Sequence, residues 1–178
     1  MSLRRCTFAV IVNDTAGVMS RVAGLFSRRG FNIASIAVGA SEAPGLSRMT
    51  IVADADDDTA EQITKQLNKL IDVIKVSEIA DDEAVARELA LIRVSATAAQ
   101  RAEISQVAGI FRARIVDVTE RSVMIETTGD AEKVEALIDL LRSYGIQELA
   151  RTGRIAMVRG GHAQSQAQSQ ADFNSVAS

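Results

Sequence analysis

The chain has 178 residues, with 20 Lys and Arg against 23 Asp and Glu, and a formal net charge of −3. Hydrophobic residues make up 47% and charged residues 24%, which is typical of a globular protein and excludes disorder throughout. One cysteine, Cys6, excludes an internal disulfide, and one histidine, His162, makes a Cys/His zinc site and Cys-His catalysis poor hypotheses.

The same composition leads to expectations about compartment and partners. We expect a reducing cytoplasm, because a protein with one cysteine needs no oxidising environment. No apolar run reaches the roughly 18 residues of a membrane span, and residues 1–5 lack the apolar core of a signal peptide. Residues 1–80 carry 9 basic and 9 acidic side chains and residues 81–158 carry 10 and 13, so we expect no nucleic-acid partner.

The first eighty residues predict six elements in the order β-α-β-β-α-β. Apolar, β-branched runs predict the strands, and apolar residues at helical spacing predict the two helices. This order is that of a ferredoxin-like domain with two helices on one face of a four-stranded antiparallel sheet. The predicted elements are residues 7–13, 18–29, 33–39, 47–53, 59–70 and 73–79.

The second half predicts the same order with a different sequence. Its predicted elements are residues 89–95, 101–111, 114–118, 122–127, 131–144 and 146–150, followed by an extended segment over 154–158. The fold class is therefore α+β, with two tandem ferredoxin-like βαββαβ domains. We expect domains at residues 1–80 and 87–160, joined by a linker over 81–86. The Gln- and Ser-rich residues 161–178 predict a disordered C-terminal tail, which includes His162.

Two connections could bind a small molecule. The turn Asp14-Thr15-Ala16-Gly17 precedes a helix, whose first N–H groups suit a carboxylate or phosphate, although Asp14 or Thr15 could equally cap that helix. Asn32 follows the glycine that ends the same helix and offers both an amide donor and an acceptor. Such an Asn can also be an ordinary turn residue.

Other kinds of functional site find little support in the sequence. The Asp-rich segment 54–58 lacks the spacing of a calcium loop and is interpreted as a cap for the helix that follows. Cys6, which has no histidine partner, is interpreted as a buried, inert thiol. Dinucleotide, phosphate-loop, nucleophile-elbow and metalloprotease motifs are absent from the sequence, and an RNA-recognition module would need stacking aromatics that only Phe8 could supply.

Several segments together resemble a known family, the small regulatory subunits of acetolactate synthase, also called acetohydroxyacid synthase. In the first half the resemblance rests on TAGVMSRV (15–22), GLFSRRGFNI (24–33), AVG (37–39) and PGLSRMTI (44–51). In the second half it rests on FRARIVDV (111–118) and ELARTGR (148–154). The resemblance covers about residues 4–160 and identifies residues 1–80 as an ACT domain.

This resemblance implies a function without catalysis on this chain. Members bind a separate catalytic large subunit, raise its activity and confer feedback inhibition by a branched-chain amino acid, usually valine, in the biosynthesis of valine, leucine and isoleucine. The catalytic subunit carries thiamine diphosphate, magnesium and FAD, so no cofactor is expected here. Members form homodimers through their ACT domains. The alternative function is a free-standing ACT-type amino-acid sensor that regulates another protein.

The resemblance also implies a valine site between two paired ACT domains. Backbone amides near Gly17 and Val18 would bind the carboxylate, and Asn32 of the partner domain would bind the polar head. The residues assigned to this site are Asp14, Thr15, Gly17, Val18, Asn32, Ile33 and Val38. Ile33 and Val38 would line the space for the isopropyl group. An acidic Asp14 would repel the carboxylate, so Asp14 is expected to cap the helix or to contact the ammonium.

Overall fold

The computed structural model describes residues 3–160, and the predicted tail over 161–178, with His162, lies outside these residues. The described chain divides into two compact units. Among the described residues, the first unit runs to Val85 and includes residues 156–160, and the second unit is Ala86–Ile155.

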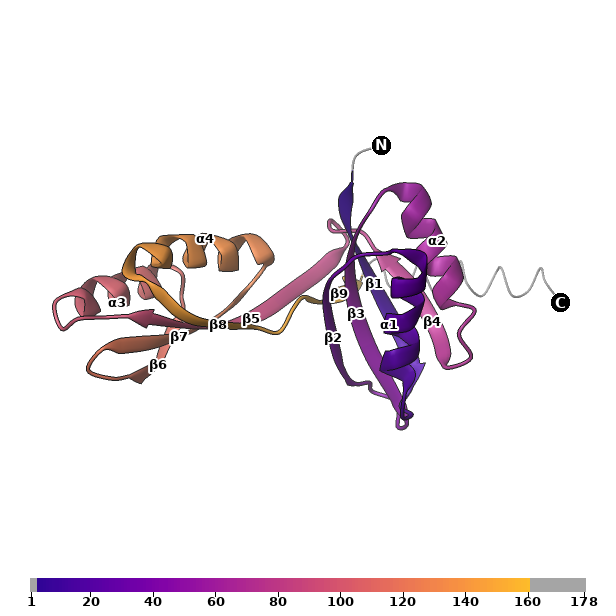
Figure 1. Cartoon of the computed structure of the whole chain (residues 1–178), viewed down its shortest axis with the longest axis horizontal. Helices are drawn as coiled ribbons and strands as arrows, with labels where there is room; N and C mark the ends of the chain where they lie inside the picture. Colours follow the sequence, from indigo (N-terminus) through magenta and orange to yellow (C-terminus); the bar gives the residue numbers. More distant parts are fainter. Residues whose placement is uncertain (1–2, 161–178) are drawn as a thin grey trace. The chain divides into compact units, whose positions relative to one another are not determined.

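The first unit has a four-stranded antiparallel sheet in the order β2-β3-β1-β4. Both helices of this unit cover the same face of the sheet (Figure 1). The elements are β1 (Arg4–Asn13), α1 (Val18–Arg29), β2 (Ile33–Ala40), β3 (Leu46–Ala55), α2 (Asp57–Leu67) and β4 (Val73–Ile79). This is the predicted ferredoxin-like βαββαβ arrangement.

The helix ends follow from local chemistry. Gly30 adopts a left-handed conformation with φ 69° and ends α1, as a glycine at this position commonly does. Asp56 caps α2 by accepting a hydrogen bond of 2.9 Å from the backbone N–H of Thr59. The cap confirms the interpretation of the Asp-rich segment, but α2 begins at Asp57 and ends at Leu67, whereas the prediction was residues 59–70. Asp57 and Asp58 form the first turn because carboxylates favour a helix N-terminus.

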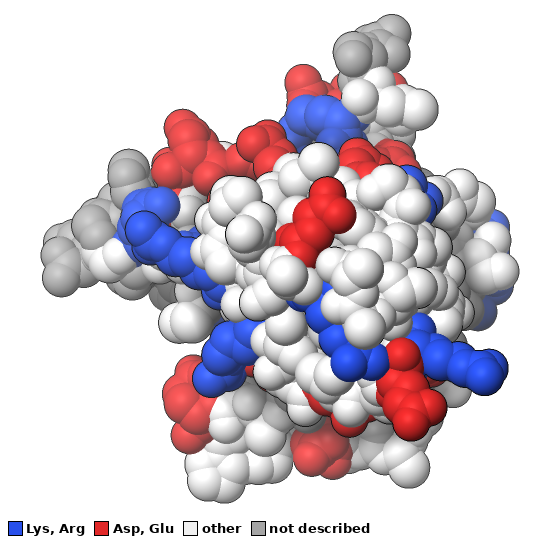
Figure 2. Space-filling model, turned by 90° about the vertical axis from the view of Figure 1, so that its left-hand side faces the viewer, with Lys and Arg blue, Asp and Glu red and all other residues white. Residues whose placement is uncertain are grey.

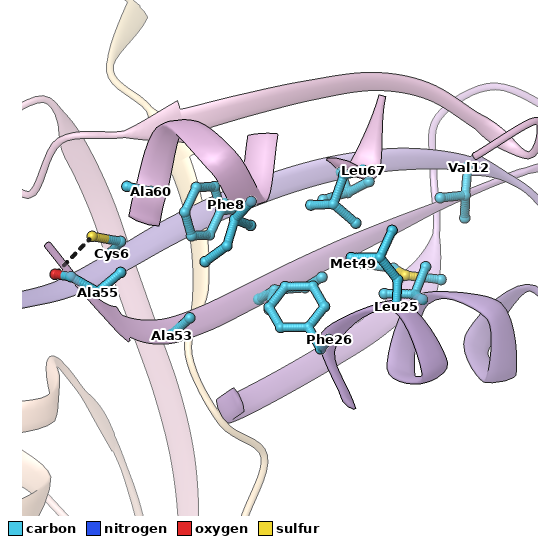
Figure 3. Close-up of a cluster of buried hydrophobic side chains, with 14 of the residues drawn as sticks. Cys6, Phe8, Val12, Leu25, Phe26, Met49, Ala53, Ala55, Ala60 and Leu67 are labelled. Carbon is cyan, nitrogen blue, oxygen red and sulfur yellow. Dashed lines mark hydrogen bonds between the residues drawn. The ribbon is translucent and has the colours of Figure 1, made fainter. Parts of the chain in front are cut away.

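The core of the first unit lies between the sheet and the helices. Alternate residues of β1 and β3, such as Phe8 and Met49, point to the helix face of the sheet. There they pack against apolar residues of both helices, such as Phe26 of α1 and Leu67 of α2 (Figure 3). Cys6 is 1% exposed, as predicted, with its Sγ 3.8 Å from the carbonyl oxygen of Ala55 (dashed in Figure 3). Burial raises the pKa of this thiol, which keeps it protonated and unreactive.

The opposite face of this sheet is also largely covered. Thr7, Ala9, Thr50, Val52 and Ile79 point away from the helices, yet each is buried. A second layer covers them. It consists of the start of β5 (Ala84–Ser95), where Ala84 is buried, and β9 (Ile155–Val158), which pairs with β5 and buries Ala156.

One hydrogen bond attaches this layer to the sheet, and another joins its two segments. Arg48 Nη2 on β3 donates to the carbonyl oxygen of Ala156 at 3.1 Å, and the N–H of Arg159 donates to the carbonyl oxygen of Glu83 at 2.9 Å. Strand β5 begins at Ala84, five residues before the predicted start. The reason is that β9 provides a pairing partner for these residues, and the composition of residues 84–88 does not show that partner.

The second unit has the strand order β6-β7-β5-β8 with antiparallel pairing. Its two helices lie on one face of the sheet, as in the first unit (Figure 1). Its further elements are α3 (Gln100–Ile110), β6 (Arg114–Val118), β7 (Ser122–Gly129), α4 (Ala131–Leu141), a 3-10 turn (Arg142–Tyr144) and β8 (Ile146–Arg151). Its core is built from aliphatic residues such as Ile92, Ile125 and Leu137.

Charge is evenly mixed on the second unit. Arg93 on β5 forms ion pairs with Glu148 at 3.2 Å and with Asp117 at 3.8 Å, and Arg114 pairs with Glu126 at 2.7 Å. Lys and Arg are interspersed with Asp and Glu on the face shown in Figure 2. No single-sign surface of the kind that binds nucleic acid gathers on this face.

Candidate functional site

The turn between β1 and α1 is the first predicted binding element, and backbone hydrogen bonds hold it. Asn13 donates to the carbonyl oxygen of Asp72 at 2.8 Å, and Asp14 donates to that of Gly45 at 2.8 Å. These bonds tie the turn to the segment before β4 and to the segment before β3. The backbone of the turn is therefore fixed by neighbouring parts of the sheet.

Gly17 is the residue immediately before α1, with φ 85°. This left-handed conformation strains any residue with a Cβ, which explains a glycine here. Gly17 has no side chain with which to cap the helix, and no acidic residue lies in the first turn. The N-terminal N–H groups of α1, such as those of Met19 and Ser20, have no acceptor within the helix.

The alternative that Asp14 or Thr15 caps α1 finds no support in the geometry. Thr15 Oγ1 donates to Asp72 Oδ1 at 3.4 Å and so faces another partner. Within residues 3–160, the Asp14 carboxylate makes no hydrogen bond or ion pair, and Asp14 is exposed. The Val18 N–H, by contrast, already donates to the carbonyl oxygen of Thr15 at 3.3 Å. Of the two backbone amides assigned to the ligand carboxylate, that of Val18 therefore already has a hydrogen-bond acceptor within the chain.

Arg21, in the first turns of α1, lies beside this turn and was not among the predicted site residues. Its Nε donates to Asp72 Oδ2 at 2.6 Å, and the Asp72 side chain is only 13% exposed. A Cβ added at Gly17 would lie 3.1 Å from Arg21 Nη1. The guanidinium therefore lies directly beside the turn. The spacing of four residues, one helical turn after Gly17, is the signal that could have found it.

Asn32, Ile33 and Val38 lie on or next to β2, the edge strand of the sheet. Asn32 Nδ2 is within 3.4 Å of Asp54 Oδ2, which leaves the amide oxygen of Asn32 as an acceptor. Ile33 packs against the core, and Val38 is 46% exposed. Val38 pairs with buried Met49, so its side chain points to the helix side of the sheet edge.

The structure does not bring the two predicted elements together within one chain. Gly17 precedes α1 and Asn32 follows it, and a helix of 12 residues is about 18 Å long. The turn and Asn32 therefore lie at opposite ends of α1. They can form one site only if each comes from a different chain.

The described residues contain neither a cluster of metal-ligating side chains nor a helix that could span a membrane. Residues 3–160 contain no group of three His, Cys, Asp or Glu side chains arranged to hold a metal ion. Over the same range, every helix is too short or too polar to cross a lipid bilayer.

Comparison with known proteins gives the same family for both halves of the chain. The family described as "AHAS small subunit-like ACT domain" matches residues 8–75, and "Small subunit of acetolactate synthase" matches residues 87–160. A relative from Archaeoglobus fulgidus, "Probable acetolactate synthase small subunit", is 61% identical over 86% of this chain and 96% of its own length. The chain belongs to the family of acetolactate synthase small subunits.

Two further relatives agree. The "Acetolactate synthase small subunit" of Mycolicibacterium smegmatis is 54% identical over 86% of this chain and 91% of its own length. The crystal structure of the acetolactate synthase small subunit from Thermotoga maritima is 48% identical and has a TM-score of 0.83. That comparison covers 88% of this chain and 98% of the Thermotoga chain, so the likeness extends over both units.

Proposed function

We propose that this chain is the regulatory subunit of an acetolactate synthase. It binds the catalytic large subunit, raises the activity of that subunit and confers feedback inhibition by valine. The observation that carries the proposal is the match of both halves of the chain to this one family, at 61% identity with a relative over nearly its full length. The thiamine diphosphate, magnesium and FAD of the reaction are assigned to the catalytic subunit.

We propose further that the functional form is a homodimer in which two copies pair through β2. Strand β2 is an edge strand, and an edge strand presents unpaired backbone groups to a partner. Antiparallel pairing places the start of one β2 beside the end of the other. Because α1 runs back along β2 within each chain, Asn32 of one copy then approaches the Gly17 turn of the second copy.

The effector site follows from this pairing. The N-terminal N–H groups of α1 bind the valine carboxylate, and the Arg21 guanidinium beside Gly17 favours the same negative charge. Asn32 of the second copy offers its amide oxygen to the ammonium, and Ile33 and Val38 contact the isopropyl group. Asp14 and Thr15 belong to the turn, and the exposed Asp14 carboxylate is available to the ammonium.

The test is synthase activity of the reconstituted enzyme as a function of valine concentration. Gly17→Asp places a carboxylate where that of valine would bind, so we expect the half-inhibiting concentration to rise roughly 10- to 150-fold, the value of a lost charge-assisted hydrogen bond of about 1.5–3 kcal/mol. Gly17→Asn is the matched control, because it introduces the same backbone strain without the charge.

We expect a clearly smaller rise for Gly17→Asn and activation of the catalytic subunit by both variants. Equal rises would mean that backbone strain alone perturbs the site, and an unchanged value for Gly17→Asp would remove the turn from the effector site. Failure of the wild-type chain to co-purify with a thiamine-dependent large subunit would favour the free-standing sensor instead.

A further inference from the structure

A hollow of about 270 Å³ lies on the face of the first sheet that faces away from the helices. It is separate from the Gly17 turn, from Asn32 and from the helix layer. Strands β1, β3 and β4, the β2–β3 connection and β9 border it. The lining residues are Ala9, Ile11, Glu42, Arg48, Lys75, Ser77, Ile79, Met157 and Val158.

The strand register places two cations across this hollow. Ile11 on β1 lies directly opposite Arg48 on β3 and directly opposite Lys75 on β4. The three residues therefore form one row on one face, and the two cations are two strand spacings apart, about 10 Å between their backbones. Side chains as long as Arg and Lys can bend over Ile11 toward one small anion.

These two cations lack carboxylate partners. Neither Arg48 nor Lys75 forms an ion pair within the described part of the chain, whereas Arg4, Arg5, Arg21 and Lys65 of the same unit all do. Arg48 uses one of its five N–H groups on the carbonyl oxygen of Ala156, which holds the guanidinium at the edge of the hollow.

The remaining lining gives the hollow an apolar floor. The next row of the sheet has Ala9 opposite Ser77, and these two small side chains leave the volume unfilled. Ile79 lies beyond them, and Met157 of β9 borders the hollow while remaining 64% exposed. Glu42 is exposed on the β2–β3 connection and leaves the lining with a net charge of +1. This charge matches a singly charged anion better than a phosphate dianion.

We propose that this hollow is a second small-molecule site, and that its ligand is a small aliphatic carboxylate. Arg48 and Lys75 bind the carboxylate, and the alkyl group lies on Ala9 and Ile79 with Met157 at its side. A volume of about 270 Å³ is near the lower end of known ligand pockets, which suits a ligand of a few carbons. Because β9 is one wall, bound ligand holds β9 against the sheet.

The test is calorimetric titration of the full chain with isovalerate, which is a five-carbon branched carboxylate without an amino group. The titration is done in the Gly17→Asp background, so that the effector site proposed above does not contribute. We expect saturable binding that Lys75→Gln weakens about tenfold and that Ser77→Leu, which fills the hollow, abolishes. Lys69→Gln, a cation of the same unit outside the lining, should leave binding unchanged.

The neutral isostere isovaleramide measures how much the charge matters. Weaker binding of isovaleramide than of isovalerate supports a carboxylate site, and equal binding would overturn the proposal. Absence of saturable binding at millimolar isovalerate would also overturn it. So would binding that neither Lys75→Gln nor Ser77→Leu changes. Circular dichroism of each variant verifies that a loss of binding is not a loss of fold.

Discussion

The two units share one strand order but begin their first helices differently. In the second unit, Gln100 N–H donates to Thr97 Oγ1 at 3.3 Å and Thr97 N–H donates to Gln100 Oε1 at 3.1 Å. This reciprocal pair satisfies the helix start with the chain's own side chains. In the first unit the corresponding turn ends in Gly17, which has no side chain. The first helix of the second unit therefore has side-chain hydrogen bonds at its N-terminus, whereas the first helix of the first unit has no side-chain cap.

The outer faces of the two sheets differ as well. In the first unit, the start of β5 and β9 cover the face that the helices leave open, and apolar residues such as Ala9 and Val52 are buried there. In the second unit the corresponding face carries ion pairs of Arg93 and Arg114. Removing β9 and the start of β5 would expose the apolar residues of the first sheet to water and so destabilise the first unit. The charged face of the second sheet is stable in water without such a layer.

The largest effect is expected from removing the cover of the first unit. The predicted domain boundary at residue 80 implies that a chain ending near Ala80 folds on its own, and the family resemblance implies that this fragment dimerises and binds valine. The structure leads to a different expectation, because that fragment exposes Ala9, Val52 and Ile79. Roughly 200 Å² of apolar surface corresponds to a loss of about 5 kcal/mol at 25 cal/mol per Å².

Urea unfolding measures this loss. The matched control joins residues 1–85 to residues 156–160 by a short Gly/Ser linker, which keeps the cover and removes only the second unit. We expect a higher free energy of unfolding for the joined chain than for the 1–80 fragment. Equal values would show that β9 does not belong to the first unit.

A smaller effect is expected from breaking the one buried ion pair of the second unit's sheet. Glu88 on β5 is 6% exposed and pairs with Arg151 on β8, which also contacts Glu135 at 2.9 Å. Burial alone would lower the pKa of Arg151, but the hydrogen bonds that Arg151 donates to Glu88 and Glu135 raise it overall. Arg151→Ala leaves the Glu88 carboxylate buried without a partner, so we expect a loss of about 3 kcal/mol.

Arg142→Ala is the control for this variant. Arg142 pairs with Asp139 at 3.0 Å at the surface, and such exposed pairs contribute about 0.5 kcal/mol. Both variants are compared by urea unfolding of the full chain. If Arg151→Ala lowered the free energy of unfolding no more than Arg142→Ala, the ion pair between Glu88 and Arg151 would not contribute to stability.

The smallest effects are expected from the caps of α2 and α4, the second helix of each unit, which are both aspartates. Asp56 accepts from the N–H of Thr59, and Asp130 accepts from the N–H of Lys133 at 2.8 Å. Asp130→Ala should cost about 1 kcal/mol, as for other N-caps. Asp56→Ala should destabilise in the same direction.

The Asp56 cap should depend on pH. Hydrogen bonds from the Thr59 side chain and backbone lower the pKa of Asp56 in the folded state. A lowered pKa means that the carboxylate stabilises the fold at neutral pH, and that this contribution is lost as the pH falls through that pKa. Melting temperatures of wild type and Asp56→Ala should therefore differ at pH 7 and converge in acid. A difference that stays constant with pH would contradict the cap.

Local patterns in the sequence were sufficient for the order of strands and helices in both units. Period-two alternation in strands and helical spacing of apolar residues depend on neighbours within a few positions, so a single sequence displays them. Glycines at a helix end, such as Gly30, act equally locally. The family was also predictable, because residues 15–33 and 44–51 carry its motifs without reference to the fold.

Tertiary structure alone decided the features that depend on distant segments. Strand β5 begins at Ala84 because β9 pairs with it, although some seventy residues separate them in the sequence, and the cover on the first sheet comes from the same pairing. The ion pair that holds the Arg21 guanidinium comes from Asp72, in the segment before β4, and the spacing between Gly17 and Arg21 does not show it. The row of Arg48, Ile11 and Lys75 exists only through the register of three strands. Such contacts depend on chain segments that meet only on folding, so no local pattern contains them.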